Sequence, residues 1–381
     1  MNRLPIAAIT LVSAVLASTA LMAQAPALPA APLAAAPTAV APTGAAPTTA
    51  SATPPAVDTV VVDARTEQVI KGALKYLAAK QTPNGSWTSP NGEHPVAVTG
   101  YTLFAMLATG NLPNEGEYGK NVSNGVAFLL NCVRPDGYIT SEGAAAGKKG
   151  SNMYDHGIGT LALAEIYGQT QDPKVREKLV LAIKLIISAQ NKAGGWRYQP
   201  RPSDADMSVT VLQVVALRAA KNAGLEVPQE VIDKAVQYVK SCQDAKSGGF
   251  CYQPHQGPGF ARTAAAIYSL QVCGLYDDPM VKAGAEYLIR VKVPPTGEWF
   301  TYGSFYAAPA FYMIGGEQWK AWYDKLKTSL LEAVIVSDGD KSIAYWNGLD
   351  GNSRPVGPVY ATAVYTAILA MPYHYIPLYQ R

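Results

Sequence analysis

The stretch QTPNGSW, residues Gln81–Trp87, is the sequence feature that decides the fold. On its own it reads as a turn closed by an aromatic residue, but the chain repeats it. Close copies are QNKAGGW (190–196) and QDAKSGGF (243–250), and looser ones are NCVRPDGY (131–138), VPPTGEW (293–299) and KSIAYW (341–346). Recurrence at roughly fifty residues is typical of an array of structural repeats.

Each of these turns separates two helical patterns of different character. The segments before the turns, such as 67–80, 174–190 and 229–243, alternate apolar residues at three- and four-residue steps with lysine and glutamate. They predict amphipathic helices with one face in water. The segments after the turns, such as TGYTLFAMLATG and SVTVLQVVALRAAKNAG, are apolar on nearly all sides, so they predict buried helices.

Six such helix pairs predict an all-α fold of twelve helices, an (α/α)6 toroid. Stacked pairs bury their inner faces only against their neighbours, so an open array leaves its end helices exposed. The sequence shows no distinct polar capping units at either end of the array. A closed ring of six inner helices within six outer ones buries all six apolar helices.

The N-terminal region has a different composition from the repeats. Residues 1–25 combine an early arginine, a long apolar run and the small-residue pattern Ala23-Gln24-Ala25, which predicts a secretory signal peptide. The alternative is an uncleaved anchor, because the apolar run is nearly long enough to span a bilayer. Residues 26–60 are rich in alanine and proline and predict an extended linker. We therefore expect a toroid domain over 61–381, periplasmic or secreted, with no stable membrane span after cleavage.

Charge and cysteine content exclude several classes of partner. The net charge is +3, with 15% charged residues and no basic run interleaved with aromatics, so no nucleic-acid partner is expected. The four cysteines have no metal-ligand spacing, and we expect neither a metal nor a cofactor. Cys242 and Cys251 flank one turn and either form a disulfide, as export permits, or remain as buried free thiols.

The turn and the helix that follows it carry a family resemblance. GGWRYQP (194–200), GGFCYQP (248–254) and SVTVLQVVAL (208–217) resemble the repeat of squalene-hopene cyclases and protein prenyltransferase β subunits. The resemblance covers about 66–381 and implies the α/α toroid. It implies less about activity, because a fold does not settle function.

The catalytic motifs of the resembled families are only partly present. Cyclases of this kind open one inner helix with D-x-D-D-T, whose middle aspartate is kept protonated by burial and protonates an alkene. Read from Asp204, the stretch SDADMSVTVLQVVAL keeps Asp206 as that acid; read back from the Ala216-Leu217 pair, it places Ser208 and Val209 there instead. The second register is favoured, because an insertion would turn the helix face. The Asp-x-Cys zinc ligands of the prenyltransferases are absent.

Departures from the repeat are the other candidates for functional residues. Thr99, Thr210, Thr263 and Thr362 occupy one recurring position, where their hydroxyls are expected to bond back to the preceding turn. His156 and Tyr306 replace that threonine in two units, and Asp155 and Arg262 take the place of residues that are mostly apolar one position earlier.

From these departures we expect Asp155, His156, Arg262 and Tyr306 to converge at the mouth of the ring, with Asp204 and Asp206 near them. Asp206, Asp155 and His156 are the catalytic candidates. The ligand-binding candidates are Arg262, Tyr306, Tyr154 and Asp204. The alternative for Asp155 and Arg262 is an ion pair that braces the ring, and His94, His255 and His374 are expected at the surface or in satisfied positions.

Three classes of function remain open at the level of sequence. The leading one is a cyclase- or prenyltransferase-like toroid that binds, or transforms, an apolar, isoprenoid-type small molecule in its central cavity, which 22 tyrosines would help to line. The second is a carbohydrate-active toroid, which needs a carboxylate pair such as Asp155 with Asp206 across the cavity. The third is a non-catalytic envelope scaffold, favoured if tyrosine and tryptophan side chains fill the ring.

Overall fold

The computed structural model describes residues 60–141 and 152–379, which contain twelve α-helices that alternate between an outer and an inner position. The outer helices are α1 (Ala64–Ala79), α3 (Gly119–Cys132), α5 (Pro173–Ala189), α7 (Gln229–Ser241), α9 (Pro279–Val291) and α11 (Gly316–Ala333). The inner helices are α2 (Pro95–Ala108), α4 (Met153–Thr170), α6 (Met207–Asn222), α8 (Phe260–Val272), α10 (Phe300–Ile314) and α12 (Pro358–Leu369).

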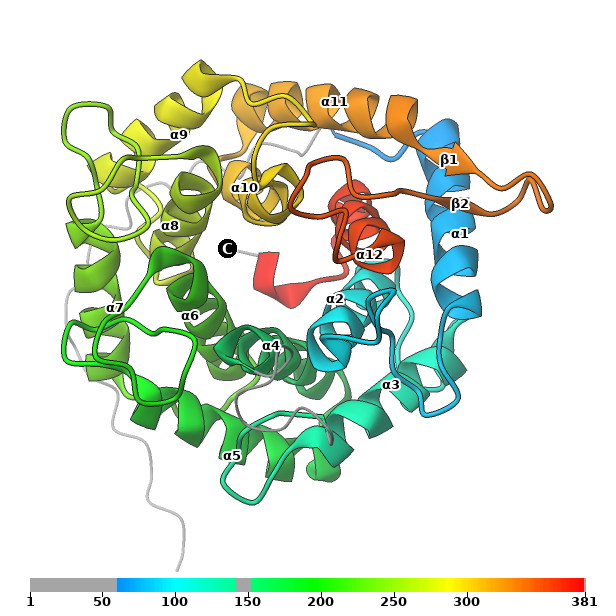
Figure 1. The fold of residues 1–381 in the computed structure, drawn as a ribbon, viewed down its shortest axis with the longest axis horizontal. Helices are drawn as coiled ribbons and strands as arrows, with labels where there is room; N and C mark the ends of the chain where they lie inside the picture. The colour runs from blue at the N-terminus through cyan, green and yellow to red at the C-terminus, as the bar shows by residue number, and fades with distance from the viewer. Residues whose placement is uncertain (1–59, 142–151, 380–381) are drawn as a thin grey trace, which may run out of the picture. The chain divides into compact units, whose positions relative to one another are not determined.

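The inner helices form a closed ring. Each packs against the next one in sequence, and α12 packs against α2 to close the circle, with the outer helices around it (Figure 1). The predicted α/α toroid is therefore confirmed. Residues 1–59 lie outside the described residues, and with them the predicted signal peptide and nearly all of the linker.

Two small elements depart from the helix-pair pattern. A short antiparallel pair, β1 (Ile335–Val336) with β2 (Ala344–Tyr345), lies between α11 and α12. After α12 the chain forms two 3₁₀ turns, η1 (Met371–Tyr373) and η2 (Pro377–Tyr379), and η2 contacts α4, α6 and α10. The C-terminal segment thus lies across the centre of the ring (Figure 1).

The repeated glutamine ties three of the turns to the next outer helix. The Gln81 side chain donates to the carbonyl of Gly85 in its own turn and to that of Asn121 in α3, both at 2.9 Å. Gln190 and Gln243 repeat this, reaching Val231 in α7 at 2.8 Å and Met280 in α9 at 3.4 Å. The glutamines therefore satisfy carbonyls of two chain segments and fix the spacing of successive units.

The repeated aromatic and threonine form the second tie within four of the units. The Trp196 amide donates to Thr210 Oγ1 at 3.1 Å, and its indole donates to the Ile186 carbonyl of α5 at 2.8 Å. The same amide-to-threonine bond joins Trp87 to Thr99, Phe250 to Thr263 and Trp346 to Thr362. The expected bond between these threonines and the preceding turn is confirmed.

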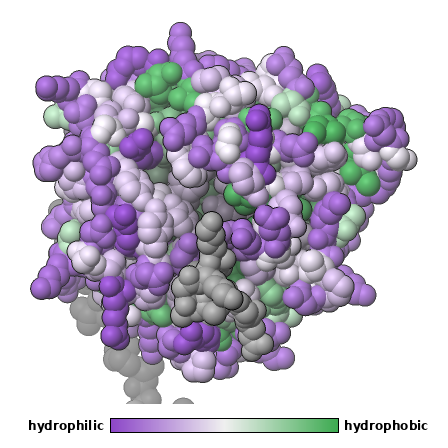
Figure 2. Space-filling view, viewed as in Figure 1, coloured by the Kyte–Doolittle hydropathy of each residue, from purple (hydrophilic) through white to green (hydrophobic). Residues whose placement is uncertain are grey.

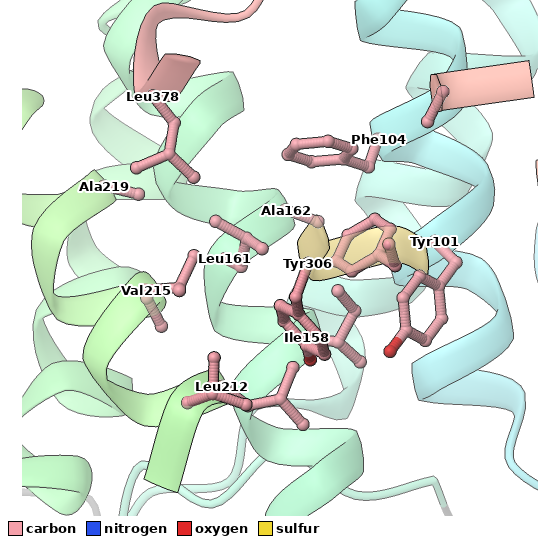
Figure 3. Packing of buried hydrophobic residues seen from close by; sticks show 14 of the residues in the cluster. Tyr101, Phe104, Ile158, Leu161, Ala162, Leu212, Val215, Ala219, Tyr306 and Leu378 are labelled. Carbon is pink, nitrogen blue, oxygen red and sulfur yellow. The ribbon is translucent and has the colours of Figure 1, made fainter. Parts of the chain in front are cut away.

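Packed apolar side chains fill the interior of the ring. Figure 3 shows side chains of the inner helices and of the C-terminal segment pointing toward one another, among them Phe104, Leu161, Val215 and Leu378. All are buried. The four cysteines are free, and Cys242 and Cys251 are both buried, so the alternative of buried free thiols is the one found. No helix in the described ranges has the length and hydrophobicity needed to cross a membrane.

Candidate functional site

Aromatic rings occupy most of the middle of the toroid. Tyr101 of α2 meets Phe305 of α10 and Tyr360 of α12 edge to face, with ring centroids 5.0 and 5.1 Å apart. Tyr302 and Tyr306 of α10 pack in the same way at 4.9 Å. Such edge-to-face contacts stabilise a rigid aromatic interior.

A pocket of about 170 Å³ lies at the end of the ring where the inner helices begin. The N-terminal residues of α2, α4, α10 and α12, together with the loop before α12, form its walls. The lining residues are His94, Ala97, Val98, Tyr101, Asn152, Tyr154, Ile158, Trp299, Tyr302, Asp350, Asn352, Ser353, Val356 and Tyr360. The pocket therefore combines aromatic walls with a few polar groups, as small-molecule sites do.

Three buried aspartates lie at the starts of inner helices, and each accepts a backbone amide there. Asp155 accepts from Ala97 of α2 at 3.2 Å and Asp206 from Val209 of α6 at 2.9 Å. Asp350 accepts from Thr301 of α10 through the amide at 3.0 Å and the hydroxyl at 2.6 Å. Carboxylates at helix N-termini satisfy free amides and oppose the positive end of the helix dipole, which accounts for burying three of them.

Asp155 pairs with His94, which the sequence predicts at the surface or in a satisfied position. His94 Nδ1 lies 3.4 Å from Asp155 Oδ2. The bond to Asp155, which outweighs the effect of burial, raises the pKa of His94 above its ordinary value. His94 lines the pocket and has a left-handed backbone at φ 53°, a conformation that often accompanies functional sites in folded proteins.

A chain of hydroxyls connects the pocket to Asp206. Tyr154, on the pocket wall, donates to Ser208 Oγ, and Ser208 donates to Asp206 Oδ1 at 2.6 Å. The other carboxylate oxygen lies 3.3 Å from Arg197 Nε. Burial raises the pKa of Asp206, against the opposing effect of these hydrogen bonds and of the arginine. Asp206 itself does not line the pocket, so any influence on a ligand passes through Ser208 and Tyr154.

The expected convergence of Asp155, His156, Arg262 and Tyr306 is not found. His156 is fully buried beside α5, where both ring nitrogens bond to the backbone. Arg262 donates to the Gly257 carbonyl of its own turn at 3.1 Å, and the predicted ion pair with Asp155 is not formed. Tyr306 is buried in the ring interior, beneath the pocket residue Tyr302.

Asp204 and Asp206 are close in sequence but differ in environment. Asp204 is half exposed and pairs with Arg197 Nη1 at 2.7 Å, whereas Asp206 is fully buried. The carboxylate pair of the carbohydrate hypothesis, Asp155 with Asp206, consists of two buried helix caps rather than two pocket groups. Among the residues described, no three histidines, cysteines or acidic residues cluster as a metal site would require.

Most of the residues that line the pocket were not predicted from the sequence. Trp299 closes the fifth turn, yet the residue is 47% exposed and its amide donates to Asn352 Oδ1 at 3.1 Å instead of to a threonine. The recurring threonine is the fourth or fifth residue of its inner helix, and in α10 these places hold Gly303 and Ser304 rather than the Tyr306 that the sequence suggests. Asp350 gave no signal in the sequence, since it lies in a loop outside the repeat.

The comparisons with known proteins address the fold. No family model matches the chain, and no curated protein does. Among solved structures, the type II terpene cyclase MstE from Scytonema in complex with geranylgeranyl dihydroxybenzoate is 15% identical, with a TM-score of 0.54 over 82% of this chain and 99% of that one. The glycoside hydrolase family 76 mannosidase Bt3792 from Bacteroides thetaiotaomicron is 12% identical, with a TM-score of 0.58 over 81% and 98%.

A third similar structure is the cellobiose 2-epimerase from Bacillus thermoamylovorans, 13% identical, with a TM-score of 0.58 over 80% of this chain and 98% of that one. At such identities these likenesses establish the α/α toroid alone. The fold is thus shared with proteins of terpenoid and of carbohydrate chemistry, and the choice between the two classes has to come from the pocket.

Proposed function

We propose that the protein binds the end of an apolar, isoprenoid-type ligand in the pocket at the N-terminal end of the inner ring. The observation that carries this proposal is an aromatic-walled pocket of about 170 Å³. An engineered protein cavity of about 150 Å³ takes up a single benzene molecule. The pocket therefore accommodates one ring or one branched terminal group, and the rest of a longer ligand extends from the mouth.

Two further observations support this ligand class. The turns resemble those of squalene-hopene cyclases and prenyltransferase β subunits, and one similar toroid structure holds a geranylgeranyl compound. The aromatic faces of Tyr101, Tyr302 and Tyr360 suit apolar or cationic groups. The location we propose is the periplasm or the exterior of the cell, on the strength of the predicted signal peptide.

A binding experiment tests this proposal. Farnesol, geranylgeraniol and α-1,6-mannotriose are titrated into the full chain by calorimetry, and the same series is repeated with Ala97→Phe, which fills the pocket. We expect saturable 1:1 binding of the prenyl alcohols, weakened at least tenfold by Ala97→Phe while thermal unfolding shows that variant still folded. Prenyl alcohols that fail to saturate the wild type, or that bind Ala97→Phe unchanged, would overturn the proposal.

Asp155 and Arg262, which the structure places apart, give a paired control. Asp155→Asn removes the charge that holds His94 and should weaken prenyl alcohol binding severalfold through that side chain. Arg262→Ala removes a residue that bonds within its own turn and should leave binding unchanged. Equal effects of the two variants would contradict the placement of the site at His94.

A sugar ring is the second candidate. The exposed ring of Trp299 at the pocket mouth is the observation that favours it, because sugars stack on such faces. In that case mannotriose, rather than the prenyl alcohols, saturates the protein, and Trp299→Ala removes the binding.

Conversion of a whole polyprene is not expected. The pocket is smaller than the roughly 300 Å³ at which sites for drug-sized ligands begin, and Asp206, the motif's acid, is buried outside it. Squalene incubated with the purified protein should stay unconverted when the extract is examined by gas chromatography and mass spectrometry. A pentacyclic product that disappears in Asp206→Asn would restore the cyclase reaction.

A further inference from the structure

A second, larger hollow lies on the flank of the toroid, between the outer helices α9 and α11. It has a volume of about 670 Å³, within the range of small-molecule sites. Phe260 of α8 and Phe300 of α10 stack at its floor, with ring centroids 6.2 Å apart and planes inclined by 12°. Figure 2 shows apolar residues at the surface over this part of the ring, and another apolar patch toward β1 and β2.

The walls of this groove are mostly apolar. Apolar side chains from the end of α9, from the loop after it and from one face of α11 form them: Leu288, Ile289, Val293, Pro294, Pro295, Ala321, Trp322 and Leu326. Ile289 is 48% exposed, which is unusual for a large aliphatic side chain on an otherwise solvated outer helix. Such a contiguous exposed apolar surface commonly marks a binding site.

The repeat explains why the groove is open at this place. In three other units a glutamine in the turn donates to the first turn of the next outer helix, as Gln243 does to α9. The turn after α9, VPPTGEW, has no glutamine and begins with Val293 and two prolines. Among the described residues, no glutamine bond of that kind ties this turn to α11, and the groove lies between the two helices.

Three polar features of the groove point to the kind of ligand. Ser304, on its floor, is fully buried, and its hydroxyl has no hydrogen-bond partner among the described residues, which is costly unless a ligand satisfies it. Lys292 and Lys325 line the groove and form no ion pair within the described ranges. Glu317 is the only acidic lining residue, so the lining carries a net charge of +1.

We infer that this groove binds a long-chain fatty acid, with the alkyl chain along the apolar walls and the carboxylate held by Lys292, Lys325 and Ser304. A neutral hydrocarbon would leave both lysines and the serine hydroxyl without a role. A hydrophilic anion would leave the aromatic floor exposed. A carboxylate on an alkyl chain satisfies the cations, the buried donor and the apolar surface together. The site is separate from the central pocket and does not depend on the function proposed for it.

Calorimetry with dodecanoate and with dodecan-1-ol tests this inference on the full chain. We expect dodecanoate to bind 1:1 and at least tenfold more tightly than the alcohol of equal length, because only the acid uses the lysines. The double variant Lys292→Ala/Lys325→Ala should remove most of that preference. Lys282→Ala, which changes an exposed lysine of α9 outside the groove, is the matched control and should leave binding unchanged.

Blocking the groove supplies the second readout. Ala321→Trp fills it from α11 and should abolish dodecanoate binding, while farnesol titrations report separately on the central pocket. Equal affinity for the acid and the alcohol, binding that survives Ala321→Trp, or a concentration-dependent dimer that Ala321→Trp dissociates would each overturn the inference. The last result would assign the groove to a second copy of the chain.

Discussion

At the scale of single residues, His156 replaces two side chains of the standard repeat. Its Nδ1 accepts the Ile139 amide at 3.2 Å, as a threonine hydroxyl does in the other units, and Nε2 lies 3.2 Å from the Ala182 carbonyl of α5, as the tryptophan indole does. Ile139 stands where those units have their aromatic. The sequence shows His156 as a departure from the repeat. Because Ile139 replaces the aromatic of the same unit and bonds to His156, the two substitutions together keep the bond between turn and inner helix, which is a structural role.

His156 predicts a loss of stability in acid. Burial lowers the pKa of His156 to about 4, below the value of 6.5 for an unperturbed imidazole. Because the unfolded chain then binds the proton more readily, stability is full above pH 6.5 and is lost as pH falls toward 4, by on the order of 3 kcal/mol. Urea unfolding at pH 7 and pH 4.5 should show this loss in the wild type and a smaller one in His156→Thr. An equal loss in both would contradict it.

Asp155 and His156, both catalytic candidates from the sequence, are adjacent in α4 but contact different elements. Adjacent residues on a helix point about 100° apart, so Asp155 faces the pocket side of α4 while His156 faces α5. Asp155 instead meets His94 from the neighbouring helix α2. Tyr154, a ligand-binding candidate from the sequence, lines the pocket. Contacts between residues distant in sequence, such as His94 with Asp155, could not be predicted, because they depend on how the helices pack in the ring.

At the scale of elements, the turn is the unit that assembles the toroid. Its glycines allow a left-handed backbone and, at some positions, a close approach to the next outer helix. Gly194 has φ 94°, and a Cβ atom there would lie 2.2 Å from the Lys234 carbonyl oxygen of α7. The turn backbone therefore touches the next outer helix directly. Helix types and turn positions could be read from sequence because four of the units repeat this contact, through Gly85, Gly137, Gly194 and Gly248. The capping role of the aspartates and the α9–α11 groove could not, because each occurs where the repeat is broken.

Alanine substitutions separate the two roles of glycine. Gly224 has a similar φ of 87°, but no atom lies within 4 Å of the place that a Cβ would take, so Gly224→Ala should cost only the left-handed backbone penalty of about 1 kcal/mol. Gly194→Ala adds the collision with α7 and should cost at least twice as much. Denaturant midpoints of the two variants provide the measurement, and equal destabilisation would contradict the close approach.

At the scale of the whole molecule, the two ends of the ring differ. The pocket opens where the inner helices begin, whereas the C-terminal segment closes the other end, where Tyr379 packs edge to face on Phe104 at 5.8 Å. Glu165 of α4 is buried beneath this segment, and burial raises its pKa to about 8 despite a hydrogen bond from the Leu378 backbone. The closed ring could be predicted from the period of the sequence repeat. The C-terminal segment that closes one end could not be predicted, because it has no counterpart in the repeats.

Glu165 predicts a second pH dependence, of opposite sign to that of His156. Its folded pKa lies above the ordinary value of 4.5, so its contribution to stability is full below pH 4.5 and is lost as pH rises toward 8, by on the order of a few kcal/mol. Glu165→Gln should remove this loss and gain stability relative to the wild type at pH 8. A variant that is no more stable than the wild type at pH 8 would show that Glu165 is not held protonated by the segment.

A crystal structure of the protein with farnesol bound tests the proposed pocket most directly. We predict density for the terminal isoprene in the pocket among His94, Tyr302 and Tyr360, with the rest of the chain passing Trp299 and the interior aromatics unmoved. Farnesol density deep in the ring, reached by displacing Tyr306 or the C-terminal segment, would contradict it, as would a pocket that stays empty at saturating ligand.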